Sequence, residues 1–426
     1  MEVRLENRYK KLVRSHMQIG NEISAGVKNV LTQDSAFNQT QAAWRFFNNK
    51  NCTLEKLSQP LLKAAHELSE QECDQYQLIP HDWSCISYRS HKSKNDTYQV
   101  NNKAIGYDLQ SSLMISDRHG GPLSLVAMNL KTNEGTLSTY SNMLKGLTHL
   151  EELSKRIDWL ESQSFKKPLI HIIDREADSI SFLRSVEKRK WVIRINDDNY
   201  AYDSTSDQKI KNIAKGLLFS QARLVNYKGL KATQQIAETM ITITRAARPN
   251  RKTVDGKKLP RIRIKGEALT ARLVVSRIID NSGKELAMWY LLAKNLDSVS
   301  ASTIALWYYW RWSIESYFKL MKSAGMQLES WQQITGEAIA RRILVASMAC
   351  VCVWRIAHAK GPKANELRII LVRLSGRQMK RQKTFTLPAL LSGLWSLLSL
   401  QDLLENYSIS KIQSLIAEAF GDKNFV

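Results

Sequence analysis

The sequence predicts an α/β protein with helical segments at both ends of the chain. Apolar residues recur at spacings of three and four before about residue 76 and again after about residue 338. Between these limits, short apolar runs alternate with turn signals such as Asp117–Gly121, as they do in the strands of a sheet. With 426 residues, 43% of them hydrophobic, the chain is long enough for roughly two to four domains with buried cores.

Three helices are expected in the N-terminal segment. They cover Leu12–Val30, residues 40–47 and Thr53–Leu68. Thr53 would cap the third helix by accepting a hydrogen bond from a backbone N–H of its first turn. We therefore predict a helical domain over residues 1–75.

A regular order of strands and helices follows. Pro168–Ile173 is a continuous apolar run, which is typical of a strand buried on both faces. Three strands precede it as a meander, one helix comes before it and one after it, and a fifth strand closes the series. These other elements are expected at Gln77–Ser87, Leu109–Ser116, Pro122–Asn129, Tyr140–Leu160, Glu176–Glu187 and Trp191–Ile195. This order is that of a ribonuclease-H-like α/β core.

Residues 197–285 depart from that order and predict a β-rich insertion. It contains a basic segment from Arg245 to Lys265, which is either a contact for a polyanion or a solvated charged loop. An apolar strand, Ala287–Ala293, and another helix come next. We predict that the ribonuclease-H-like domain spans residues 76–335. A helical C-terminal domain would then cover residues 336–426, with a break at Lys360–Lys363.

The charge of the chain favours a polyanionic partner. The sequence has 62 Lys and Arg against 40 Asp and Glu, a formal net charge of +22, which suits nucleic acid or an anionic membrane surface. The longest apolar run, Ile343–Trp354, is too short to span a bilayer, and the N-terminus shows no apolar signal-peptide core. The five cysteines form no CxxC pair and the eight histidines no HExxH. We expect a cytoplasmic protein without a disulfide framework, a zinc ribbon or a membrane partner.

Four polar residues share one face of the helix that follows Ala287–Ala293. Tyr308, Arg311, Glu315 and Lys322 lie at spacings of three, four and seven, so on one continuous helix they fall within an arc of about 60°. A carboxylate can hold a divalent metal, and Arg, Lys and Tyr can hold phosphate oxygens. The simpler alternative is an ordinary solvated ion pair between Arg311 and Glu315.

Two upstream aspartates could complete a metal site with Glu315. Asp82 lies within the first predicted strand, and Asp174 directly follows the buried strand. The first and fourth strands of a ribonuclease-H-like sheet are neighbours, so these carboxylates could face each other, as two-metal phosphoryl transfer requires. Taken alone, Asp174 could instead cap the next helix, and Asp82 could be a partly exposed strand residue.

These motifs resemble the three signatures of DDE transposases of bacterial insertion sequences, and most of all the insertion-sequence-four group, which includes the transposon-five transposase. The motifs are Asp82-Trp-Ser, the string from Asp174 to Asp178 (DREAD), and Tyr308-(two)-Arg311-(three)-Glu315-(six)-Lys322. Residues 44–48, WRFFN, resemble the family's N-terminal YRF stretch. The resemblance covers about residues 20 to 330. Trp83 departs from the family pattern, which has Thr there.

The resemblance implies a chemistry and a role for each site residue. Asp82, Asp174 and Glu315 would bind two Mg²⁺ ions, for which Mn²⁺ can substitute, and Tyr308, Arg311 and Lys322 would contact phosphates near the transferred end. Such enzymes nick the transposon end, form and open a hairpin, and join the 3′-hydroxyl to target DNA. Trp289 matches the residue on which the family stacks a flipped base; the alternative is a core tryptophan.

The same resemblance implies the partners. The N-terminal helices would bind the inverted repeats of double-stranded transposon DNA, and the C-terminal helices would pair two protomers, although internal packing explains their apolar content equally well. The protein would act at the nucleoid in the bacterial cytoplasm. Two other functions fit the same motifs: a metal-dependent nuclease of this fold that cuts without joining, and a transposase-derived regulator that only binds DNA.

Overall fold

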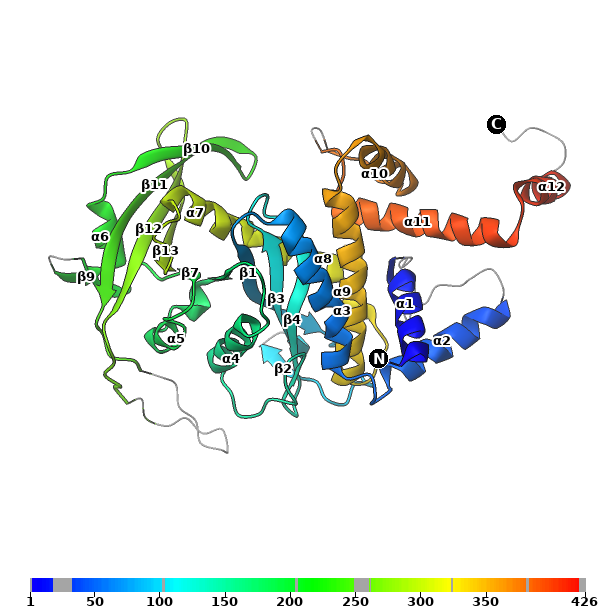
Figure 1. The fold of residues 1–426 in the computed structure, drawn as a ribbon, viewed down its shortest axis with the longest axis horizontal. Coiled ribbons are helices and arrows are strands. Elements are labelled where there is room, and N and C mark those ends of the chain that lie inside the picture. The colour runs from blue at the N-terminus through cyan, green and yellow to red at the C-terminus, as the bar shows by residue number, and fades with distance from the viewer. Residues whose placement is uncertain are drawn as a thin grey trace. The chain divides into compact units, whose positions relative to one another are not determined.

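The computed structural model describes residues 2–17, 33–101, 104–203, 206–248, 260, 262–322, 325–380 and 383–420 (Figure 1). The chain divides into two compact units, which we describe separately. The helical unit comprises Met1–Leu61, Cys85–Tyr107 and Tyr317–Val426, and the sheet unit comprises Leu62–Ser84 and Asp108–Ser316. The protein is thus a mixed α/β structure with a large sheet and many helices, as the sequence predicts.

The central strands follow the order β5-β4-β3-β1-β6-β7-β13-β12-β11-β8-β9, and β10 pairs with β11. Their bounds are β1 (Gln77–Ser87), β3 (Ala104–Ser116), β4 (Pro122–Lys131), β5 (Thr136–Ser138), β6 (Leu169–Ile173), β7 (Trp191–Arg194), β8 (Tyr200–Tyr202), β9 (Asp207–Lys209), β10 (Ser220–Tyr227), β11 (Leu230–Ile243), β12 (Leu269–Asp280) and β13 (Glu285–Lys294). Strands β1, β6 and β7 run parallel to one another. The predicted adjacency of the first and fourth core strands, β1 and β6, is confirmed.

Helices that lie wholly or partly in the described residues of the sheet unit are α3 (Leu54–Glu72) from Leu62 on, α4 (His149–Glu161), α5 (Ile180–Ser185), α6 (Ile210–Lys215), α7 (Ala301–Trp310) and the start of α8 (Trp312–Lys322). Helices α4 and α5 lie side by side against the sheet (Figure 1). Their apolar residues, such as Ile157 and Leu183, form one buried cluster with Trp191 and Ile193 of β7. Strands β8 to β12 fall within residues 197–285, the range in which the sequence predicts a β-rich insertion.

Three predicted helices differ in extent from the observed ones. The helix expected at Tyr140–Leu160 begins only at His149, where Thr148 and Glu151 form a capping box. The helix expected at Glu176–Glu187 is a 3₁₀ turn, Arg175–Ala177, followed by α5, because Ser179 starts a new helix by capping it. The helix expected through Tyr308 and Lys322 is interrupted at Arg311, between α7 and α8.

The helical unit contains α1 (Val3–Met17), α2 (Gln33–Phe47), α9 (Gly336–His358), α10 (Pro362–Leu374), α11 (Leu387–Asn406), α12 (Ile409–Phe420) and the short strand β2 (Tyr98–Asn101), and α3 (Leu54–Glu72) starts in it. Thr53 caps α3 as predicted by accepting from the Lys56 N–H. Helix α9, which holds the apolar run Ile343–Trp354, is the core against which α1, α2 and α11 pack. The part of the predicted first helix beyond Met17 lies outside the described residues.

Helix α9 is buried on almost all sides, including at two arginines. Arg341 is 2% exposed, and its guanidinium donates to the carbonyls of Cys52 and Phe47, both at 2.7 Å. One of these bonds satisfies the carbonyl of Phe47, the last residue of α2, where the helix itself supplies no donor. One described helix, α11, is long and apolar enough to cross a bilayer, a test that a buried core helix passes equally.

We predict that Gly120→Ala destabilises the protein more than Gly146→Ala does. Both glycines have positive φ angles, 68° and 72°. A Cβ on Gly120 would lie 2.3 Å from the Trp310 ring, whereas a Cβ on Gly146 meets nothing within 4 Å. We expect Gly120→Ala to lower the free energy of unfolding by about 2–3 kcal/mol and Gly146→Ala by about 1 kcal/mol. Urea denaturation measures both, and equal losses would contradict the packing of Trp310 on this turn.

Candidate active site

Two adjacent parallel strands present Asp82 and Asp174 at neighbouring positions. In the register of β1 and β6, His81 lies opposite Ile173, and each aspartate is the next residue along its strand or just after it. Because parallel strands keep their residues in step, the two carboxylates emerge at the same level of the sheet. Asp174 also caps the 3₁₀ turn Arg175–Ala177. The capping role that the sequence left open for Asp174 is therefore present, and it does not exclude a role in the candidate site.

The third predicted carboxylate, Glu315, stands in the first turn of α8. The break before it is small, since Arg311 keeps helical dihedrals (φ −49°, ψ −30°) and its N–H donates to the Tyr308 carbonyl at 3.1 Å. The chain remains nearly helical, but it turns enough to end one hydrogen-bond series and begin another. Trp307 and Ile314 are buried on either side of this junction.

Arg311 bridges the two aspartates. Its Nη1 lies 2.5 Å from Asp82 Oδ2, and its Nη2 lies 3.0 Å from Asp174 Oδ2. The arginine is only 4% exposed. A solvated ion pair between Arg311 and Glu315 was the simpler sequence alternative, but here the guanidinium is buried and pairs with Asp82 of β1 and with Asp174, which follows β6. Removing one partner of a buried ion pair is strongly destabilising, because the other charge is left buried without compensation.

Asp174 has two further partners. The Tyr308 hydroxyl donates to its Oδ1 at 3.1 Å, and Arg194 Nε lies 2.7 Å from the same oxygen. Sequence reasoning missed Arg194. Its signal was present, since it is the single charged residue in the apolar strand Trp191–Ile195. The carboxylate thus lies among a phenol and two guanidinium groups.

The carboxyl groups of Glu315 and Asp82 influence each other's titration. Burial raises the pKa of the Glu315 carboxyl, and the negative charge of Asp82 and a hydrogen bond to it raise that pKa further. Burial also raises the pKa of Asp82, against the opposing charge of Arg311. The pKa of Glu176, in the same DREAD string, is raised by burial and by the charges of Asp82 and Asp174. Such a concentration of carboxyl groups is a common property of functional sites.

The donor set fits a hard divalent cation. Mg²⁺ prefers carboxylate oxygens and is usually held by one or two of them together with substrate phosphates. Within the described residues, no three His, Cys, Asp or Glu side chains converge as a ready metal cage, and Arg311 instead neutralises two of the three carboxylates. A metal ion at Asp82, Asp174 and Glu315 would therefore take over a position in which a guanidinium group now supplies the positive charge.

Lys322 ends α8 within the helical unit. Its ammonium donates to the Cys85 carbonyl and lies 3.7 Å from Glu329 Oε1. Like Tyr308 and Arg311, it contacts protein oxygens here, so the phosphate contacts expected of these three residues stay predictions.

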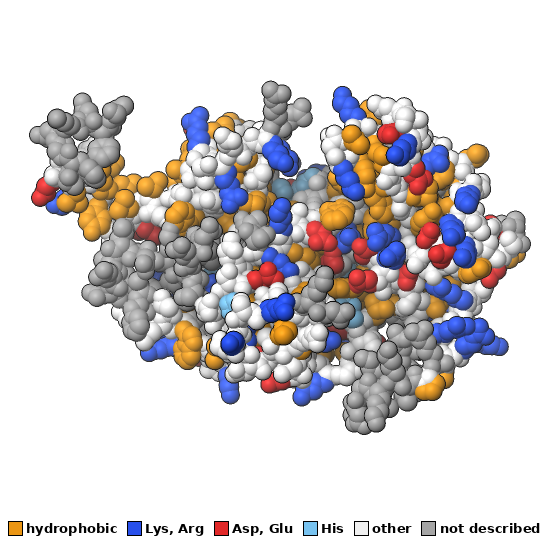
Figure 2. Space-filling model, turned by 180° about the vertical axis from the view of Figure 1, so that it is seen from behind, with side chains coloured by type: hydrophobic (Ala, Val, Ile, Leu, Met, Phe, Trp, Pro, Cys, Tyr) orange, Lys and Arg blue, Asp and Glu red, His pale blue; other side chains and the backbone are white. Residues whose placement is uncertain are grey.

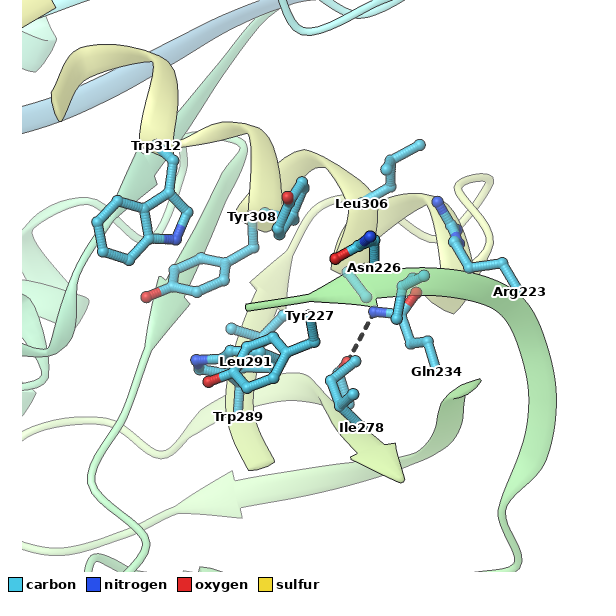
Figure 3. A pocket seen from close by; sticks show the side chains of 14 residues that line it. Arg223, Asn226, Tyr227, Gln234, Ile278, Trp289, Leu291, Leu306, Tyr308 and Trp312 are labelled. Carbon is cyan, nitrogen blue, oxygen red and sulfur yellow. Dashed lines mark hydrogen bonds between the residues drawn. The ribbon is translucent and has the colours of Figure 1, made fainter. Parts of the chain in front are cut away.

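Trp289 lines an open cavity in the sheet unit. The cavity has a volume of about 290 Å³ and lies between α7 and the face of β10 to β13 (Figure 3). Trp289 is half-buried and meets Tyr227 edge-on, with ring centroids 6.1 Å apart. The structure therefore places it in a cavity wall rather than in the core. The other lining residues are Arg223, Val225, Asn226, Tyr227, Gln234, Ser276, Ile278, Leu291, Ala305, Leu306, Tyr308, Tyr309 and Trp312.

The family model of the transposase DDE domain matches residues 74–352, a stretch that contains Asp82, Asp174 and Glu315. The chain belongs to this family. It is therefore a transposase, an enzyme of DNA transposition that acts as a polynucleotidyl transferase or endonuclease, and its family uses divalent metal ions.

Two further comparisons accompany this match. No curated protein matches the sequence. Among solved structures, the transposase is similar to a chain of the piggyBac transposase synaptic complex with hairpin DNA, with a TM-score of 0.42 and 10% sequence identity; the match covers 99% of this chain and 77% of that one.

We predict that Arg311→Met lowers the stability of the metal-free transposase and strengthens its response to metal. Removing the guanidinium takes the paired cation from Asp82 and one of the two guanidinium partners from Asp174, which should reduce the free energy of unfolding by about 3 kcal/mol. Adding Mg²⁺ or Mn²⁺ should restore more stability in the variant than in the wild type, because no guanidinium has to be displaced. Denaturation with and without metal measures both effects.

The matched control is Arg189→Met, because the ion pair of Arg189 with Asp158 is largely exposed. That variant should change stability by less than about 1 kcal/mol and leave the metal response unaltered. An identical metal response in Arg311→Met and the wild type would contradict the competition between Arg311 and the ion.

Proposed function

We propose that the protein is a cut-and-paste DNA transposase of the insertion-sequence-four group that cleaves transposon ends and joins their 3′-hydroxyls to target DNA. The supporting observation is the grouping of Asp82 and Asp174, at the same level of two parallel strands, with Arg311 and Glu315 from the α7–α8 junction. A protein that only binds DNA has no need for three carboxylates held in this way.

A ribonuclease-H-like core is part of this proposal. The strands β4, β3, β1, β6 and β7 are consecutive neighbours in the sheet. Counted along the chain as the core strands, their order is third, second, first, fourth, fifth. Three antiparallel strands beside two parallel ones, with α4 and α5 as the connecting helices, are what such a core requires.

Asp82, Asp174 and Glu315 are the residues that would hold Mg²⁺ or Mn²⁺. When bound, the ions supply activation of the attacking hydroxyl and neutralisation of the leaving oxygen. The chain contributes the rest. Arg311 would move its two N–H groups from the aspartates to phosphate oxygens, because a guanidinium binds phosphate and carboxylate in the same bidentate way. Tyr308, freed from Asp174, would donate to a phosphate oxygen in the same manner.

A hairpin intermediate is proposed from the cavity beside Tyr308. A hairpin bends the backbone sharply at the DNA end, and unstacking one base relieves the bend at a cost of a few kcal/mol. Trp289, Tyr227 and Tyr308 surround a space lined mainly by apolar surface, in which a base could stack again. Base–aromatic stacking contributes about 1–3 kcal/mol, enough to offset much of that cost.

A basic groove between α1 and α2 supports DNA binding by the N-terminal helices. It has a volume of about 540 Å³, and its basic residues are Arg4, Arg8, Lys11 and Arg45. Asn7, Asn49 and Asn51 line it as well. Arg and Lys bind phosphates, and Asn can donate to phosphates or base edges. Lys and Arg side chains also occur at many places on the described part of the face shown in Figure 2, with Asp and Glu side chains among them.

The C-terminal helices support the proposed pairing of two protomers. The buried residues of α11 lie between Ala389 and Leu394, whereas Leu400 and Leu404 further along are 45% and 50% exposed. In α12, Ile409 and Ile416 are 62% and 44% exposed. Among the described residues, the fully buried side chains of α11 thus lie in its first half, and we propose that a second copy of the chain covers the apolar side chains exposed further along.

We predict that Glu315→Gln retains binding to end DNA but loses cleavage. The change removes one metal ligand while keeping the size of the side chain. The loss should exceed the roughly 10–100-fold typical of residues that merely support a ligand. Gel-shift binding and single-turnover nicking in Mg²⁺ measure the two properties, and Glu285→Gln, at the exposed start of β13, is the matched control. Unchanged nicking in Glu315→Gln would contradict the site.

Strand transfer separates the transposase from a nuclease of the same fold. A pre-cleaved end with a free 3′-hydroxyl should join to plasmid DNA in Mg²⁺. If the protein only degrades DNA and never produces joined molecules, the nuclease alternative is correct.

We also predict that Trp289→Ala slows hairpin formation by roughly 10–100-fold, since it removes the stacking surface for one base. First-strand nicking should change little, because it precedes the sharp bend. Separate rates measured on intact and on pre-nicked ends provide this comparison within one variant. Equal losses in both steps would indicate that Trp289 has only a structural role.

A further inference from the structure

The helical unit has a strongly basic stretch that runs from the end of α9 along α10 and into the loop after it. Residues 355–383 contain nine Lys and Arg against one acidic residue, Glu366, so they contribute +8 to the net charge of +22. Such a concentration of one sign of charge is typical of a surface that binds a polyanion. The exposed basic residues of this stretch are Arg355, Lys360, Lys363, Arg373, Arg377, Lys380 and Lys383.

Four of these side chains form a basic ridge, which we define as Lys363, Arg373, Arg377 and Lys380. Lys363 and Arg373 are ten residues apart in α10, which places them within about 80° of each other around the helix and about 15 Å apart along its axis. Arg377 and Lys380 follow shortly after the last turn of the helix. All four are exposed, and none forms an ion pair with a carboxylate in the part of the chain that the structure describes. Their charges therefore face solvent without a partner from the helical unit.

The helix that carries the ridge is held firmly in place. Helix α10 packs on α11 (Figure 1), where the backbone of the buried Leu371 lies so close to Gly393 that no Cβ would fit between them. At the other end of α10, the Arg368 guanidinium donates to the carbonyls of Ile356 at 2.8 Å and Ala359 at 2.7 Å, at the end of α9. Charged groups on a fixed helix keep their spacing when a ligand binds, as those on a loop do not.

The chemistry of the ridge fits the backbone of duplex DNA. The span from Lys363 to Arg373, about 15 Å, corresponds to about four steps of 3.4 Å along one strand of a duplex. Contacts from Lys and Arg to phosphates give affinity and position but carry no sequence information. The groove between α1 and α2 differs, because three asparagines that can donate to base edges line it together with its basic residues. A surface that offers cations alone suits DNA whose sequence changes from one insertion to the next.

We propose that the basic ridge binds the target DNA through its phosphates, independently of sequence. This inference rests on the proposed joining of transposon ends to target DNA. Ile369 and Ile370, 54% and 41% exposed beside the ridge, would also suit the surface of an anionic bilayer. Membership of a transposase family favours DNA as the polyanion, and a bilayer is one of the alternatives that the experiments below distinguish.

The first test removes three charges from the ridge in the full-length protein, with the variant Lys363→Gln/Arg373→Gln/Arg377→Gln. Binding to a duplex without the inverted repeat is measured over a range of salt concentrations. Each lost phosphate contact lowers the slope of log K against log[salt] by about 0.9, so the slope should fall by about 2–3 and the affinity on the order of tenfold. The variant should fold as the wild type does, because the three side chains are exposed.

The matched control is Lys188→Gln/Lys215→Gln/Lys284→Gln. It removes the same number of charges from exposed positions of the sheet unit. This control should keep the wild-type slope, because a lower net charge alone breaks no phosphate contact. An equal fall of the slope in both variants would show that net charge and not the ridge binds the duplex, and would overturn the proposal.

A second test measures joining. With a saturating pre-cleaved transposon end, the ridge variant should need roughly tenfold more plasmid than the wild type for half-maximal strand transfer, because only target binding is weakened. Nicking of an intact end in Mg²⁺ should proceed at the wild-type rate. A joining reaction with an unchanged plasmid requirement would contradict a role of the ridge in target binding.

A third test uses the wild-type protein and needs no variant. Acetylation of lysines is followed by mass spectrometry in the presence of a duplex without the inverted repeat. The duplex should protect Lys363 and Lys380 and leave Lys188 and Lys215 reactive. Protection of the ridge by vesicles of anionic phospholipid, but not by the duplex, would overturn the proposal in favour of a membrane surface.

The outcomes separate this inference from the proposed function. If the wild type nicks and joins but the duplex leaves the ridge lysines reactive, the ridge is refuted and the transposase proposal stands. If the duplex protects the ridge but the wild type never joins an end to plasmid, the proposed function fails, and with it the role of the ridge in holding a target.

Discussion

The two ion pairs of Arg311 hold the candidate active site together. They connect the α7–α8 junction to Asp82 on β1 and to Asp174 after β6, so one guanidinium joins three segments that are far apart in the chain. Burying three charged groups costs several kcal/mol for each, and only close geometry offsets that cost. Apolar side chains at these positions would stabilise the fold as well or better. The charged cluster is therefore best explained by chemistry, because the same carboxylates and guanidinium suit a metal ion and a phosphate.

One turn positions both ends of this arrangement. The Asp117 carboxylate, between β3 and β4, accepts from the backbone N–H groups of Asp74, Gln75 and Tyr76 and so fixes the entry to β1. Three residues later, the Gly120 carbonyl accepts from the Ser313 hydroxyl at 2.7 Å, in the first turn of α8. The strand that carries Asp82 and the helix that carries Glu315 are thus anchored to the same short segment.

A chain of buried polar side chains supports the strands behind the site. His81 contacts Ser112 at 2.9 Å and His171 at 2.9 Å, and His171 contacts Glu161 at 3.0 Å. Burial lowers the pKa of His81 well below its usual value, so its imidazole is neutral. These contacts link β3, β1, β6 and α4 just beneath the two aspartates. Fully satisfied polar chains of this kind favour a single register over its alternatives.

Local sequence patterns were sufficient for the elements with strong signals and for the family. The continuous apolar run before Asp174 marked a buried strand, and the spacing of the carboxylates within their motifs identified the chain as a DDE transposase. These signals can be interpreted without the tertiary structure, because they depend only on residues that are neighbours within one strand or one helix turn. The first residues of α4 and α5 were less predictable. These helices start at the capping residues Thr148 and Ser179, not where the apolar pattern begins.

The partners of the site residues depended on the tertiary fold. A helical spacing left open that Arg311 pairs with Glu315. Its partners in the structure are instead Asp82, 229 residues away, and Asp174, because the sheet brings these two carboxylates to the guanidinium. The surroundings of Arg194 and Gln234 depend on the fold in the same way. Arg194 lies beside Asp174, at the end of a neighbouring strand, and Gln234 lines the wall of a cavity. Contacts across strands are set by sheet order and register, and neither is written in the local pattern of residues.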